Sequence, residues 1–311
     1  MRPRGLAAAL VALGAVLAAG CGDSSRHARP ATTTPPPLLG SIASILAGPG
    51  ADLSVVPGTE DFAPGSIRFS FLLLDNQGKP VSRPHVRVFV ATSPDARPFA
   101  TTTASLEPIG VPGEADADAS GITQLYVAHF GVPRSGAYTL GIVAPGRTPA
   151  QAAFHIRVAR HPKAPAVGSQ AIASQTPTIV STHGNVRELT TRTPPDTGLL
   201  RYSIAGSIAA HKPFVVVFAT PKFCTSRTCG PVVDVVDAVR RKFSRSDIRF
   251  IHVEVYKDNN PGLGYNRWFR QWHLPTEPWT FLVGRDGRIE QRFEGSVSTG
   301  ELAAAVRRYL S

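Results

Sequence analysis

An apolar run that leads into a cysteine-containing loop is the feature that most constrains how this chain can fold. Residues 214–218 are all apolar and rich in valine, which is typical of a strand. After the loop, apolar residues at helical spacing predict a helix from Cys229 to Phe243; they are Val232, Val235, Val236, Val239 and Phe243. A strand followed by a loop and an amphipathic helix is typical of an α/β domain.

The same alternation continues toward the C-terminus. We expect helices near Leu200–Ala210 and over Tyr265–His273 and Thr299–Leu310, and strands over Ile248–Tyr256, Trp279–Val283 and Arg288–Phe293. Ser298 and Glu301 have the spacing of a capping box at the start of the last helix. Four aromatic residues are expected to pack the middle helix on the sheet: Tyr265, Trp268, Phe269 and Trp272. These patterns predict an α/β domain over residues 196–311.

Residues 39–160 have an all-β pattern. Strands are expected at Ser66–Asp75, His85–Thr92, Ile122–Phe130, Ala137–Val143 and Ala153–Val158. Apolar and polar residues alternate along the first of them, so each strand should bury one face, and two such sheets would form a sandwich. Residues 161–195 are poor in large apolar residues and contain several Pro, Ser and Thr, which predicts a linker.

The turns and strand starts of this β region resemble those of immunoglobulin-type sandwiches in exported bacterial proteins. The similar stretches are Ala63–Gly65, Asn76–Val81 and Gly136–Leu140. The resemblance implies an all-β, immunoglobulin-like sandwich that precedes the α/β domain. It implies no particular function or ligand, because this fold has many.

The C-terminal region resembles the thioredoxin superfamily. Val215–Ala219, with the cysteine loop and helix that follow, is similar to the family's active-site strand, loop and helix. Thr276–Val283 resembles the family's cis-proline loop and following strand, and Gly284–Gly287 with Phe293–Gly295 resembles its closing hairpin and glycine. The resemblance implies a thioredoxin-like fold in which Pro278 flanks the reactive sulfurs and presents backbone to a partner.

The cysteine pair departs from the family's pattern. The usual motif has two residues between its cysteines, whereas four separate Cys224 from Cys229. Two cysteines five apart on a continuous helix would lie about 8 Å apart, beyond the reach of a disulfide, so Cys224 is expected in the loop. Cys229 falls in the first turn of the expected helix, where unpaired N–H groups and the helix dipole favour a thiolate. Cys229 is therefore the preferred nucleophile.

Three functions remain open for this pair. In the first, one thiolate attacks a partner's disulfide and the other cysteine resolves the mixed disulfide. In the second, Cys224 and Cys229 form a structural disulfide in a non-catalytic, thioredoxin-like binding module. In the third, the two cysteines and either His252 or His273 hold Cu(I) in a copper-handling module. We prefer thiol-disulfide exchange, which requires no cofactor or metal.

Two carboxylates fall near the expected site. Glu254 closes a strand and Glu277 precedes Pro278, so either could accept a proton from a thiol. Carboxylates are seldom buried, and both are therefore expected to lie on the solvated surface.

The first 21 residues have the layout of a secretory signal peptide. Two arginines precede an apolar run from Leu6 to Ala19, and the small residues before Cys21 resemble a bacterial lipobox. We therefore expect a lipid on Cys21 and a polar, flexible tether over residues 22–38. The protein would then be exported and anchored to the cell membrane on its extracytoplasmic side.

The net charge and the cysteine count limit the kinds of partner that this chain is expected to bind. The formal net charge is +11, but the arginines are scattered and no basic run alternates with stacking aromatics, which argues against nucleic acid. The more modest interpretation of the positive charge is a weak attraction to anionic lipid head groups. If Cys21 carries lipid, Cys224 and Cys229 remain, in a compartment that permits disulfides. The expected partners are the membrane and exported proteins with thiols or disulfides.

Overall fold

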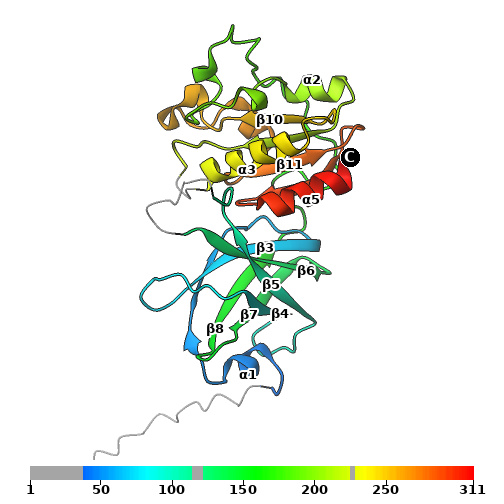
Figure 1. Cartoon of the computed structure of the whole chain (residues 1–311). Coiled ribbons are helices and arrows are strands. Elements are labelled where there is room, and N and C mark those ends of the chain that lie inside the picture. The colour runs from blue at the N-terminus through cyan, green and yellow to red at the C-terminus, as the bar shows by residue number, and fades with distance from the viewer. Residues whose placement is uncertain (1–37, 114–121, 225–227) are drawn as a thin grey trace, which may run out of the picture. The chain divides into compact units, whose positions relative to one another are not determined.

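The structure is a computed structural model of the chain, and it describes residues 38–113, 122–224 and 228–311 (Figure 1). The expected signal peptide, the lipidation site at Cys21 and the tether up to residue 37 lie outside the described residues. The described chain is mostly β-structure with few helices. Among the helices of these residues, none combines the length and the apolar character needed to cross a membrane.

Eight strands form one hydrogen-bonded sheet in the order β1-β8-β7-β4-β5-β6-β3-β2. Their bounds are β1 Ala51–Asp52, β2 Ser54–Pro57, β3 Gly65–Leu74, β4 His85–Ala91, β5 Ala100–Pro108, β6 Gln124–Val132, β7 Gly136–Ala144 and β8 Ala150–Val158. Neighbouring strands are antiparallel except β1 and β8. A short helix, α1 (Ile42–Leu46), precedes them and is capped by the Ser41 side chain.

This sheet folds over on itself. Phe69 on β3 stacks against Phe154 on β8 with ring centroids 5.7 Å apart, although four strands separate β3 from β8 in the sheet. The bend lies at β5, whose first part pairs with β4 and whose last part pairs with β6. One continuous apolar core fills the space between the two halves. A single bent sheet therefore takes the place of the two separate sheets that the sequence predicted.

The predicted strands of this region correspond to β3, β4, β6, β7 and β8, with ends that differ by a few residues. The strands β1, β2 and β5 and the helix α1 were not predicted. In β5 only Ala104 is fully buried, and three consecutive threonines occupy its first half. The apolar alternation that identifies a strand is therefore weak there.

A second sheet has four strands in the order β10-β9-β11-β12. Their bounds are β9 Phe214–Phe218, β10 Arg249–Val253, β11 Trp279–Val283 and β12 Ile289–Glu294. β9 and β10 are parallel, and β11 is antiparallel to both β9 and β12. The bounds of β9 and β11 are those predicted from the sequence, and β10 and β12 differ from their predictions by a few residues.

The central strand β9 is buried on both faces. Val215 and Val217 point into one core, which lies against α3 (Cys229–Lys242) and α5 (Thr299–Tyr309). The alternate residues of β9 enter a second core, which includes side chains of α4 (Arg267–Gln271) and α2 (Ile204–Ala209). Helices therefore cover both faces of this sheet, as Figure 1 shows for α3 and α5 on one side.

The aromatic cluster around α4 behaves largely as predicted. Phe269 and Trp272 are almost fully buried in the second core. Trp268 packs against its edge, whereas Tyr265 remains 42% exposed and stacks on Tyr256. The cluster therefore fixes α4 to the sheet through two of its four members.

Side-chain caps set the helix starts. Ser298 accepts a hydrogen bond from the Glu301 backbone N–H at 3.1 Å, which is one half of the predicted capping box. The Glu301 carboxylate does not complete the box, because it binds Arg68 instead. Asn266 and Ser203 cap α4 and α2 in the same way as Ser298.

The segment over residues 161–195, predicted as a linker, lies against the second sheet. The Gly168 N–H donates to the Ile289 carbonyl, and the Ile289 N–H donates to the Ser169 carbonyl. The Ala171 side chain belongs to the second core. Single-turn 3₁₀ helices lie in this segment and beyond it, at Val186–Glu188, Thr197–Leu199, Lys257–Asn259 and Pro261–Leu263.

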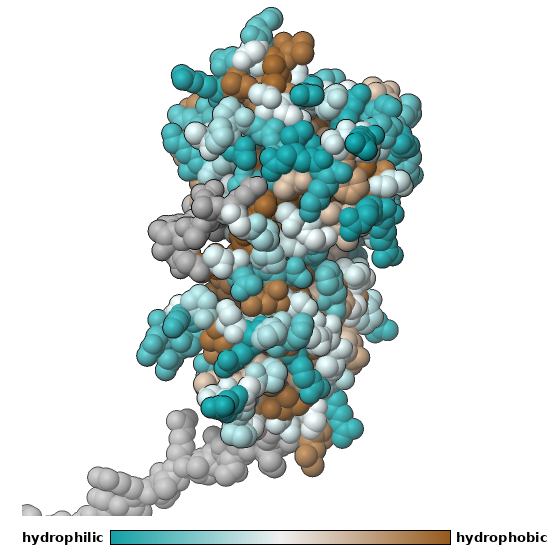
Figure 2. Space-filling view, in the orientation of Figure 1, coloured by the Kyte–Doolittle hydropathy of each residue, from teal (hydrophilic) through white to brown (hydrophobic). Residues whose placement is uncertain are grey.

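Exposed apolar residues of the described chain are scattered. Leu39 and Val180 are the most exposed large ones, at 82% and 83%. On the face in Figure 2, hydrophobic residues form small groups among hydrophilic ones. Scattered exposed apolar side chains are normal in folded proteins, so they indicate no docking face.

Arg68 on β3 and Asp61, which precedes that strand, form ion pairs with residues of α5 and β12. Arg68 donates to both oxygens of Glu301, at 2.6 and 2.9 Å, and to the Ser296 carbonyl. Arg292 donates to the Asp61 carboxylate at 3.0 Å. The side chains of Arg68 and Glu301 are only 10% and 18% exposed, so each charge depends on the other for compensation.

Replacing Arg68 by Ala is therefore expected to lower the free energy of unfolding by about 3 kcal/mol, because the substitution leaves a nearly buried carboxylate unpaired. Arg285→Ala is the matched control, since Arg285 also binds both oxygens of a carboxylate, that of Asp247, but on the exposed surface. It should cost much less than Arg68→Ala, because water screens the exposed ion pair. Urea unfolding measures both losses, and equal losses would contradict the role given to burial.

Candidate functional site

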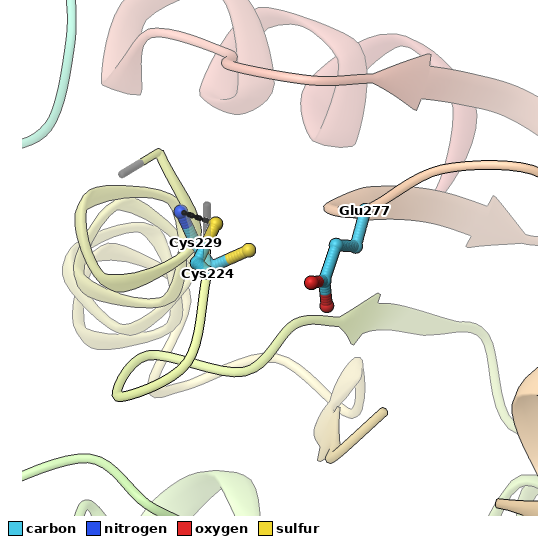
Figure 3. A group of neighbouring side chains, drawn as sticks. All are labelled: Cys224, Cys229 and Glu277. Atoms are coloured by element: carbon cyan, nitrogen blue, oxygen red, sulfur yellow. Dashed lines mark hydrogen bonds between the residues drawn. The ribbon is translucent and has the colours of Figure 1, made fainter. Parts of the chain in front are cut away.

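Strand pairing brings two distant segments to one edge of the second sheet. β9 ends at Phe218, which pairs with Trp279 at the start of the antiparallel strand β11. The loop that follows β9 and the loop that precedes β11 therefore leave the sheet at the same edge. The first loop carries Cys224, and the second carries Glu277 and Pro278. Figure 3 shows Glu277 reaching toward the two cysteines from the opposite side of the site.

The two cysteines differ in exposure. Cys229 is the first residue of α3 and is fully buried, whereas Cys224 lies in the preceding loop and is half-buried. Their sulfurs are not joined to each other in a disulfide. The backbone N–H of Cys229 donates to the Cys224 sulfur at 3.3 Å, the contact drawn in Figure 3. A free N–H at a helix N-terminus favours negative charge on the atom that accepts from it, and here that atom is the Cys224 sulfur.

The environment of Cys229 opposes the prediction that it attacks first. Burial raises the pKa of the Cys229 thiol, and the hydrogen bond to Cys224 and the charges of Cys224 and Glu277 raise it further. Among the described residues, a backbone hydrogen bond from Thr220 acts in the other direction and lowers this pKa. The start of the helix was predicted correctly, but its dipole acts on Cys224, because the side chain of Cys229 turns into the core.

Glu277 forms a group of three neighbouring side chains with Cys224 and Cys229. Its carboxylate and the two sulfurs all lie within 4.8 Å of one another. Tyr256 donates its hydroxyl to Oε1 at 3.3 Å, and Oε2 is buried with no hydrogen-bond partner among the described residues. Burial, and after it the negative charge of Cys224, raises the pKa of Glu277 to about 8, against the lowering effect of the Tyr256 hydrogen bond.

The expectation that Glu254 and Glu277 are solvated surface carboxylates is wrong for both. Glu254 is only 5% exposed, and its Oε1 accepts from the backbone N–H and the hydroxyl of Thr191. Glu277 is half-buried beside the thiols. Glu254 lies near enough to Glu277 to raise its pKa slightly. Carboxylates are usually exposed, but hydrogen bonds from residues of neighbouring loops hold these two side chains at the sheet edge.

Pro278 lies directly beside this group. The Glu277–Pro278 peptide bond is cis, as the resemblance to the cis-proline loop implies. Pro278 is buried, and its carbonyl accepts from the Gly295 N–H at 2.9 Å. The loop is therefore attached to the end of β12 as well as to β9.

Neither histidine proposed as a copper ligand belongs to the group. His252 is buried, its Nε2 lies 3.0 Å from the Ala219 carbonyl, and burial lowers its pKa. His273 is exposed just beyond the end of α4. Within the described residues, the donors that could hold a metal are the two sulfurs and the Glu277 carboxylate. Thiolate and carboxylate ligands of this kind are those of zinc sites.

Sequence reasoning missed Tyr256. Burial and the negative charge of Glu277 raise its pKa to about 12, so its hydroxyl remains a donor to Glu277. Tyr256 follows Glu254 and His252 at alternate positions in the predicted strand over residues 248–256. Because alternate residues of a strand share one face, this spacing was a usable signal for the site.

Comparisons with known proteins assign the chain to no family. No family model matches the chain, and no curated protein matches it. A thiol:disulfide interchange protein of the thioredoxin family from Chlorobium tepidum is similar at 15% identity and a TM-score of 0.29, over 35% of this chain and 86% of that protein. The PKD domain of the human receptor SorCS2 is similar at 15% identity and a TM-score of 0.20, over 47% of this chain and 96% of that domain.

The raised pKa of Glu277 predicts a specific dependence of stability on pH. In the unfolded chain a glutamate ionises near pH 4.5, whereas in the folded protein Glu277 stays protonated until about pH 8 beside Cys224, Cys229, Tyr256 and Glu254. Its stabilising contribution is therefore complete below pH 4.5 and is lost as the pH rises through 8. Relative to Glu277→Gln, the wild type should have a larger free energy of unfolding at pH 5 than at pH 8.

Urea unfolding of both proteins at the two pH values measures this difference. Glu290→Gln, on β12, removes a carboxylate away from the thiols and serves as the control. A difference between wild type and Glu277→Gln that does not change with pH would show that burial does not hold the Glu277 proton.

Proposed function

We propose that this chain is a thioredoxin-like protein that exchanges thiols and disulfides with other exported proteins through Cys224 and Cys229. The observation that carries the proposal is the hydrogen bond from the N-terminal N–H of α3 to the half-exposed Cys224 sulfur, with the thiol of Cys229 and the carboxyl of Glu277 beside it. This arrangement supplies an accessible nucleophile, a resolving thiol and a proton acceptor. Cys224, rather than Cys229, is the attacking sulfur in this proposal.

The first step is attack on a partner's disulfide. The Cys224 thiolate forms a bond to one partner sulfur, and the other partner sulfur leaves as a thiolate that takes up a proton from water. The N–H of Cys229 stabilises the thiolate before attack. Pro278, at the edge of the same group, presents backbone to the partner.

The second step is resolution of the mixed disulfide. The Cys229 thiol gives its proton to the Glu277 carboxylate and attacks the Cys224 sulfur, so a Cys224–Cys229 disulfide forms and the partner leaves as a thiolate. Formation of the mixed disulfide removes the negative charge of Cys224, which is one of the influences that raise the pKa of Glu277. Glu277 therefore ionises at a lower pH, so a carboxylate is available at the step that needs a proton acceptor.

The two cysteine variants should behave differently. Cys229→Ser is expected to accumulate a mixed disulfide between Cys224 and a peptide disulfide, because the resolving thiol is missing. Cys224→Ser is expected to form almost none, because the remaining thiol is buried and its pKa is raised. Intact-protein mass after mixing measures the adduct, and circular dichroism controls for folding.

A non-catalytic binding module with a structural disulfide is the second candidate. The complete burial of Cys229 favours it, since buried cysteines are often inert. In that case neither single variant would form an adduct, and both would lose similar stability because either one prevents the disulfide. The adduct measurement therefore separates the two candidates.

The proposal extends to the organisation and location of the chain. We place an immunoglobulin-like sandwich over residues 39–160, a thioredoxin-like domain over 196–311, and a lipid on Cys21 that anchors the exported protein to the membrane. The sequence pattern before Cys21 supports the anchor.

Replacing Cys21 by Ser removes the lipid acceptor. The variant is expected to leave the membrane fraction, and its exchange activity per molecule should not change, because the cysteine pair lies in a separate part of the sequence. Detergent phase partitioning measures the shift. Retention of Cys21→Ser in the detergent phase would contradict the lipid anchor.

A further inference from the structure

A cavity of about 400 Å³ lies in the region where β10 ends, and it shares Tyr256 with the surroundings of the cysteine pair. We call it the Glu254 cavity; its walls include Glu188, Glu254, Tyr256, Asp258 and Trp268. Tyr256 connects it to the thiols, because its hydroxyl donates to the same Glu277 carboxylate that lies within 4.8 Å of both sulfurs. A volume of this size is typical of a small-ligand pocket and can hold one long side chain.

The charged groups of the cavity are mostly acidic. Three carboxylates line it, those of Glu188, Glu254 and Asp258, against one guanidinium, that of Arg187. Glu254 is 5% exposed, and its Oε2 is buried without a hydrogen-bond partner among the described residues. A buried carboxylate oxygen is costly unless a donor reaches it, so the cavity favours a ligand that brings N–H groups and positive charge.

The remaining walls suit the stem of such a ligand. The Trp268 indole N–H already donates to the Gln175 carbonyl, so its ring offers an apolar surface. Val253 and Leu189 add aliphatic surface to the lining. Lysine and arginine side chains bury their methylene groups along apolar surface while the head group pairs with a carboxylate.

We infer that the Glu254 cavity binds a basic side chain, Lys or Arg, of the partner protein close to the sulfur that reacts with Cys224. The inference deepens the proposed exchange function by naming a class of substrate: cysteines that have a basic residue nearby. A bound cation would also offset the charge of Glu254, which raises the pKa of Glu277, so Glu277 would ionise at a lower pH and be available to take up the proton of Cys229.

Peptide mixed disulfides that differ only at the residues beside the cysteine test this inference. With Arg at these positions, reduction by the wild type should be faster than with Ala by about tenfold, and slower with Glu than with Ala. Glu254→Gln and Asp258→Asn should each reduce the Arg-to-Ala ratio of rate constants. The ratio is taken within one protein, so a partly unfolded variant does not distort it.

Asp286→Asn is the matched control. Asp286 is exposed in the hairpin between β11 and β12, at the end of β11 opposite to Glu277, and it should leave the ratio unchanged. A wild-type ratio near one would overturn the inference, as would a ratio that both cavity variants leave intact. If all peptides react at one rate, the exchange function stands and only the basic preference fails.

Redox-inert peptides, with Ser in place of Cys, separate binding from exchange. Titration calorimetry should show tighter binding of the Arg peptide than of the Ala peptide, and weaker binding by Glu254→Gln. If this preference holds while no peptide disulfide is reduced, the cavity assignment stands and the exchange function fails. If free N-acetylarginine amide binds as tightly as the Arg peptide, the cavity is a site for a small base, and the assignment to partner proteins is overturned.

Discussion

The antiparallel pairing of β9 with β11 is the constraint on which the candidate site depends. Because Phe218 pairs with Trp279, the chain leaves β9 and enters β11 at one edge of the sheet. Residues more than fifty positions apart in the sequence then meet, and a thiol-bearing loop faces a glutamate. The pairing is stable because β9 is buried on both faces, between α3 and α5 on one side and the aromatic core on the other.

Desolvation has the largest effect on the pKa values of the titratable groups at this edge of the sheet. The thiol of Cys229 and the carboxyl of Glu277 both have raised pKa values, and burial is the largest cause for each. Within the part of the chain that the structure describes, their neighbours add negative charge, and no cationic side chain shifts either pKa. The Cys229 thiol and the Glu277 carboxyl therefore both keep their protons until a charge beside them changes. Such mutual dependence is typical of sites in which proton transfer accompanies a covalent step.

The parts of the fold with strong periodicity could be predicted from the sequence. β9, β11 and the start of α3 lie where their apolar patterns indicate, because a buried strand and an amphipathic helix have distinct periods. β5 could not be found, since its threonines and alanines carry little alternation. The contact of Cys224 with the N-terminus of α3 could not be found either. Both cysteines lie near that N-terminus, and only the side-chain direction decides which sulfur accepts its N–H.

The order β10-β9-β11-β12 also has a consequence for how the chain acquires its structure. β9 and β10 are near in sequence and can pair early, but the other edge of β9 receives its partner only when residues 279–283 have been made. Until then the all-apolar strand Phe214–Phe218 keeps an unpaired edge, which is a template for self-association. Any truncation before β11 would leave this edge of β9 unpaired.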